Sequence, residues 1–116
     1  MYLDSARENI AVSRDTARKL YGHDIPYVLL MHVSAMSAHM MPRLIQLYRA
    51  AGFRFVSLPD AERDPAYREY TDLSLPPPPS PWELAANKGV KLGQATDYST
   101  KLAGMCPSGG PAVSSP

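Results

Sequence analysis

The chain has 116 residues, of which 45% are hydrophobic and 20% charged, and its formal net charge is +1. This length allows one modest domain, and the composition is ordinary for a soluble globular protein. Positive and negative residues are interspersed, so the sequence predicts neither a nucleic-acid nor a membrane partner. No apolar run approaches the roughly 20 residues that span a bilayer. The N-terminus has no secretory signal, and the localisation stays open.

Residues from about Tyr2 to Tyr21 predict an amphipathic helix. Apolar side chains recur at spacings of three, four or seven residues and form one stripe, which consists of Leu3, Ala6, Ile10, Ala17 and Leu20. Charged residues occupy most of the remaining surface. Gly22 is a typical C-terminal stop for such a helix. His23 and Asp24 follow in a polar link, where His23 is interpreted as a solvated loop residue.

The run from Tyr27 to His32 predicts a strand that is buried on both faces, because it is short, nearly all apolar and preceded by Pro26. Side chains alternate along a strand, so Val28, Leu30 and His32 are expected to share one face. A histidine at the carboxyl end of such a strand is a candidate catalytic residue. The competing interpretation is a satisfied buried or loop histidine.

A second helix is expected from about Ala38 or His39 to Gly52, because Pro42 is best tolerated in a first turn. The alternating run 53–58 predicts a second strand. The order helix, strand, helix, strand is typical of a parallel sheet with crossover helices, so the predicted fold class is α/β.

The rest of the chain changes in character. Asp60 and Asp64 are expected to cap short helical turns. Four prolines from Pro76 precede Ser80 and Pro81 and predict a stiff spacer, followed by two helical turns over 82–88 and by disorder from Leu92 onward. The sequence therefore divides into a folded part, 1–73, and a Pro-rich part, 74–116.

Several stretches agree in order and spacing with polysaccharide deacetylases of the NodB-homology type. The agreement covers about 2–70 and is clearest at Val28–Val33 and at Arg49–Leu58. The chain thus resembles the C-terminal portion of a metal-dependent carbohydrate deacetylase, whose fold is a distorted (β/α) barrel. Leu30-Met31-His32 fits the Leu-x-His motif of this family. The resemblance implies that His32 acts as general acid and that Leu30 contacts the acetyl methyl group of the substrate.

Other motifs of this family are absent from the 116 residues: Thr-Phe-Asp-Asp-Gly, the His-x-x-x-His metal pair and Arg-x-Pro-Tyr. The resemblance implies a zinc-like divalent metal for the full-length family, but the sequence predicts no metal or cofactor site within this chain. We expect the missing motifs upstream of Met1 and no activity from these residues alone.

Two further interpretations stay open at this point. The chain could be a non-catalytic subunit that completes the sheet of another polypeptide or self-associates through exposed sheet edges. Alternatively, it could be a small independent domain whose Pro-rich run recruits a binding module.

Overall fold

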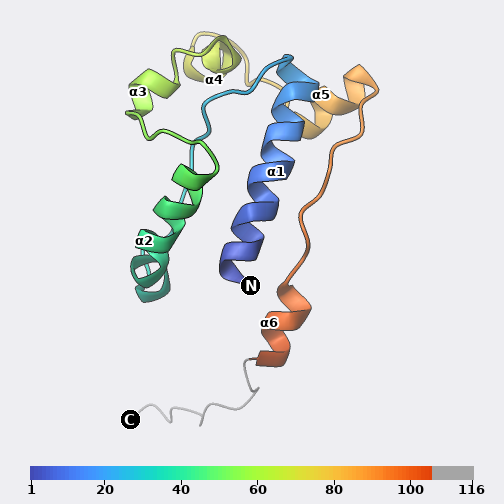
Figure 1. Cartoon of the computed structure of the whole chain (residues 1–116). Coiled ribbons are helices and arrows are strands. Elements are labelled where there is room, and N and C mark those ends of the chain that lie inside the picture. Colours follow the sequence, from blue (N-terminus) through green and yellow to red (C-terminus); the bar gives the residue numbers. More distant parts are fainter. Residues whose placement is uncertain (106–116) are drawn as a thin grey trace, which may run out of the picture.

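The computed structural model describes residues 1–105, and the part of the expected disordered tail over 106–116 lies outside the described residues. Along 1–105 the structure is helical and has no β-strand. The longest helices are α1 (Tyr2–Tyr21) and α2 (Ala35–Ala50), which run in the same direction side by side (Figure 1). No helix in this range is long and apolar enough to cross a membrane.

The first predicted helix is confirmed. Its stripe supplies Ile10, Ala17 and Leu20 to the core, and Leu20 is only 2% exposed. Gly22 ends the helix in the left-handed conformation at φ 80°, which a glycine adopts without strain from a Cβ. Its amide donates to the carbonyl of Arg18 over 3.0 Å and closes the last turn.

The second predicted helix is confirmed, although it begins three residues earlier than expected. Ser34 caps α2 by accepting a hydrogen bond from the Ser37 amide over 3.0 Å. This cap brings Pro42 into the helix interior, where proline removes one main-chain donor. The capped start and the burial of Leu44 against the rest of the fold offset that cost.

Short helices follow in the rest of the described chain: α3 (Leu58–Ala61), the 3₁₀ turn η1 (Pro65–Tyr67), α4 (Arg68–Thr71), α5 (Pro81–Lys88) and α6 (Ser99–Met105). Asp64 caps η1, as expected, whereas α3 is capped by Ser57 rather than Asp60. The turns predicted over 82–88 correspond to α5, which ends at Gly89 with φ 65°.

The predicted α/β fragment of a (β/α) barrel is wrong for the described residues. Residues 24–34 and 53–57 are extended but form no strand, and no main-chain hydrogen bond joins them. Apolar alternation identifies segments that could pair in a sheet, but a strand exists only when a neighbour accepts its hydrogen bonds. Neither segment has such a neighbour within 1–105.

Residues 90–98 return along α1, as Figure 1 shows, and lead to α6. Their composition predicts disorder, but polar contacts to α1 define their course. The carboxylate of Glu8 accepts hydrogen bonds from the Thr96 amide over 2.9 Å and from the Tyr98 hydroxyl over 2.7 Å. These two donors hold the pKa of Glu8 below its usual value.

The core is small. In the described part of the chain, the buried apolar residues are Ile10, Ala17, Leu20, Leu44, Ala61 and Ala85. Three of these six belong to α1, which contacts both α2 and α5. Helix α1 is therefore the element on which the other segments are assembled.

Candidate functional site

Leu30 and His32 lie in the extended segment between α1 and α2, and the structure exposes both side chains. Leu30 is 88% exposed, and its neighbours Val28 and Leu29 are 55% and 51% exposed. His32 is exposed as well. The expectation that this run is buried on both faces is therefore wrong for the described residues. The two residues to which the resemblance assigns roles in deacetylation are therefore exposed to solvent.

The start of this segment is anchored to the fold. The Tyr67 hydroxyl donates a hydrogen bond to the Pro26 carbonyl over 2.6 Å. The ring of Tyr27 packs edge-on against Phe53, with 5.8 Å between the ring centroids. Because the Ser34 cap fixes the other end, residues 28–33 are an exposed span between two anchored ends.

Arg14 connects α1 to the segments that precede and follow α2. Its guanidinium donates to the Ala51 carbonyl over 3.0 Å and lies 4.2 Å from the Phe53 ring centroid. Its Nε atom lies 3.2 Å from a carboxylate oxygen of Asp24 but forms no hydrogen bond. This contact is thus an ion pair, and the stacking on Phe53 adds a cation–π attraction. The sequence pattern indicated that Arg14 lies on the solvated face of the helix but did not predict these contacts.

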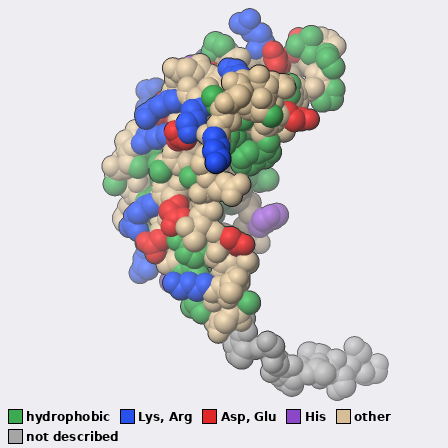
Figure 2. All heavy atoms as spheres, turned by 90° about the vertical axis from the view of Figure 1, so that its right-hand side faces the viewer, with side chains coloured by type: hydrophobic (Ala, Val, Ile, Leu, Met, Phe, Trp, Pro, Cys, Tyr) green, Lys and Arg blue, Asp and Glu red, His purple; other side chains and the backbone are tan. Residues whose placement is uncertain are grey.

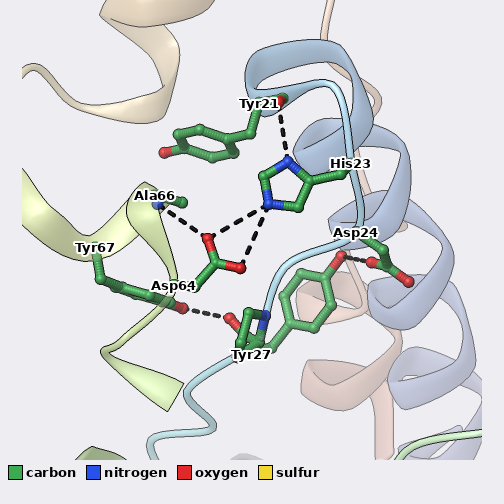
Figure 3. A network of polar contacts seen from close by, with 8 residues as sticks. Tyr21, His23, Asp24, Tyr27, Asp64, Ala66 and Tyr67 are labelled. Carbon is green, nitrogen blue, oxygen red and sulfur yellow. Dashed lines mark hydrogen bonds and ion pairs between the residues drawn. The ribbon is translucent and has the colours of Figure 1, made fainter. Parts of the chain in front are cut away.

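A second cluster of polar groups joins the end of α1 to η1 (Figure 3). The Nδ1 atom of His23 lies 3.0 Å from the Tyr21 carbonyl oxygen, and its Nε2 atom lies 3.4 Å from both carboxylate oxygens of Asp64. Asp64 also accepts the Ala66 amide over 2.9 Å. His23 is an exposed loop residue, as the sequence suggested, with 49% of its side chain accessible, and it also contacts Asp64. Because His23 and Asp64 are 41 residues apart, no local sequence pattern predicts their contact.

An aromatic groove of about 410 Å³ lies beside this cluster, between α1, η1, α4 and α5. Its aromatic residues are Tyr21, Tyr27, Tyr67, Tyr70 and Trp82. Burial raises the pKa of Tyr21 to about 12, so its hydroxyl stays neutral. The hydroxyls of Tyr67, Tyr27 and Tyr70 already donate within the chain, to the Pro26 carbonyl, the Asp24 carboxylate and the Pro79 carbonyl. The groove therefore offers mainly apolar contacts.

Charged side chains form no single-signed patch on the face that Figure 2 shows, where Lys and Arg alternate with Asp and Glu. Within 1–105, no group of three or more His, Cys, Asp and Glu side chains is arranged to hold a metal ion. The described residues therefore do not fit the divalent metal that the deacetylase resemblance implies.

No protein-family model, curated protein or solved structure matches this chain.

Proposed function

We propose that this chain supplies His32 as the general acid, and Leu30 as the acetyl-contacting side chain, of a carbohydrate deacetylase centre. The observation that carries this proposal is the Leu-x-His pattern on an exposed span with anchored ends. Leu30 is 88% exposed and His32 is exposed, so a polypeptide segment that brings substrate and metal can reach both. The ordered agreement of 2–70 with polysaccharide deacetylases supports the same function.

The role of His32 follows from the chemistry of its side chain. Cleavage of an acetyl amide or ester needs a proton on the departing nitrogen or oxygen, and an imidazole can deliver it near neutral pH. Leu30 has no polar atom and suits contact with the acetyl methyl group. The residues that hold the metal would lie outside the described residues 1–105, which provide no such group.

The test is acetate release from N- and O-acetylated oligosaccharides by the native product purified from its source cells. We expect release that stops after treatment with a chelator and returns when zinc is added. The intact mass of the same preparation is expected to exceed 12.7 kDa, with peptides that precede Met1. Acetate release that survives complete metal removal, or no release from either substrate class, would contradict the proposal.

A second candidate function is that of a non-catalytic interaction subunit. The exposed apolar span carries this alternative, because Val33 is fully exposed and the main chain of 28–33 has no main-chain hydrogen-bond partner within 1–105. Such a segment can be covered by a strand of another polypeptide or of a second copy. The structure has no sheet edge in this range, so the extended span itself would be the contact.

If the span mediates self-association, the purified 116-residue chain will sediment as a species heavier than 12.7 kDa. Val33→Asp places a charge on the span and is expected to shift the chain to monomer. Leu73→Asp is the matched control, because Leu73 is 96% exposed and lies outside the span. A wild-type chain that sediments as a monomer and melts cooperatively would exclude self-association.

A further inference from the structure

His23 lies between two groups that can only accept hydrogen bonds. On one side is the Tyr21 carbonyl oxygen, 3.0 Å from Nδ1, and on the other the Asp64 carboxylate, 3.4 Å from Nε2. A neutral imidazole carries one N–H and serves one acceptor, whereas the imidazolium carries two. The geometry therefore requires a doubly protonated His23 for both contacts to be hydrogen bonds (Figure 3).

We propose that His23 and Asp64 form a pH-dependent clamp that holds residues 62–71 against the C-terminal end of α1. When both ring nitrogens of His23 are protonated, one N–H donates to the Tyr21 carbonyl of α1 and the other donates to the Asp64 carboxylate, which caps η1. When it loses a proton, one of these two acceptors is left without its donor. The contact between the turn and α1 then becomes weaker, and residues 62–71 open more often.

The groups around His23 favour its charged form. Asp64 is 17% exposed and is held in place by its bond to the Ala66 amide, so its charge stays directed at the imidazole. The Tyr21 carbonyl belongs to the negative end of the α1 dipole. Asp24 is the second nearby carboxylate, although Arg14 pairs with it at 3.2 Å. Tyr21, Tyr27 and Tyr67 also face this cluster and are neutral phenols at physiological pH. Tyr70, another neutral phenol, and the carboxylates of Glu62 and Glu69 act on Tyr21 or Tyr67 from the turn itself.

These contacts set the direction of the pH dependence. The hydrogen bond to the Tyr21 carbonyl, and then the Asp64 carboxylate, raise the pKa of His23 above its usual 6.5. A group with a raised pKa in the folded state stabilises that state fully below the unfolded value of 6.5. The stabilisation is lost as the pH rises through the higher folded value. The clamp is thus strongest in mildly acidic solution and weaker in alkaline solution.

The clamp also acts on the span that contains Leu30 and His32. The Tyr67 hydroxyl, in the same turn as Asp64, donates to the Pro26 carbonyl over 2.6 Å. Opening of residues 62–71 therefore removes one of the two anchors at the start of this span, while the packing of Tyr27 on Phe53 is kept. This consequence does not depend on the proposed deacetylase function, because it concerns only contacts within the chain.

The test is a pH titration of the full chain by NMR, comparing wild type with Asp64→Asn. Asparagine keeps an oxygen that can accept the Ala66 amide, so the cap of η1 is retained while the charge is removed. We expect the pKa of His23 to fall in this variant. In the wild type, amide-exchange protection over 62–71, normalised to the unfolded chain, is expected to drop several-fold between pH 6 and pH 8, and in the variant this drop should be smaller because the charge of residue 64 is lost.

His23→Gln provides a second variant that does not depend on Asp64, since glutamine does not titrate. It should remove the pH dependence of protection, whereas His39→Gln, at an exposed position of α2, should preserve it. A His23 pKa that is the same in wild type and Asp64→Asn would overturn the proposal. So would protection over 62–71 that does not change with pH in the wild type.

Discussion

Replacement of His32 by alanine is expected to reduce acetate release by the native product by about 100-fold or more, the usual contribution of a positioned general acid. The loss should appear mainly in kcat, because His32 acts on the departing atom in the transition state and contributes little to substrate binding. The exposed position of His32 means that the change removes no core contact. The thermal unfolding temperature should therefore stay within the error of the wild-type value.

The matched control for this variant is His39→Ala. His39 is also exposed, and it lies seven residues away in α2, outside the exposed span. A general acid must be protonated, so kcat of the wild type should fall on the alkaline side of its pH profile. His32→Ala should lose this limb of the pH profile, whereas His39→Ala should keep it. Equal turnover in the two variants would remove His32 from the mechanism.

Helix positions in this chain follow from local sequence. The stripe from Leu3 to Leu20 and the stop at Gly22 predict α1 because each signal acts within one or two helical turns. The same holds for η1, where the cap at Asp64 is two residues from the amide it accepts. Helix α2 begins earlier than the position of Pro42 predicts, because the cap at Ser34 stabilises a start at Ala35 even with proline inside the helix.

Extended segments behave differently, because their state depends on distant partners. The short apolar run at 27–32 marks a segment that is able to pair, but pairing is decided by what lies beside it in space. Within 1–105 the main chain of this segment is extended and unpaired. The same reasoning explains why Leu30, expected in a buried strand, is 88% exposed.

The long-range polar contacts could not have been predicted from sequence patterns. Glu8 accepts donors from Thr96 and Tyr98, 88 and 90 residues away, and His23 meets Asp64 across 41 residues. A carboxylate on a helix face and a histidine in a link are ordinary solvated positions by local criteria. Only the folded structure shows that Glu8 and His23 each contact a distant segment of the chain.

The largest effect on stability is expected from Leu20→Ala. Leu20 is 2% exposed and lies on α1, which contacts both α2 and α5. Truncation removes its buried carbon atoms and leaves a cavity, which together cost about 2–5 kcal/mol in the free energy of unfolding. A domain of this size has a total stability of about 5–15 kcal/mol, so the variant should lie close to its unfolding threshold.

Urea denaturation followed by circular dichroism measures this loss. The midpoint for Leu20→Ala should fall strongly without a large change in slope, because both forms expose nearly the same surface on unfolding. Leu73→Ala is the matched control: the same chemical change at a side chain that is 96% exposed should alter the free energy by less than about 0.5 kcal/mol. Equal midpoints for the two variants would mean that α1 does not form the core around which the other segments pack.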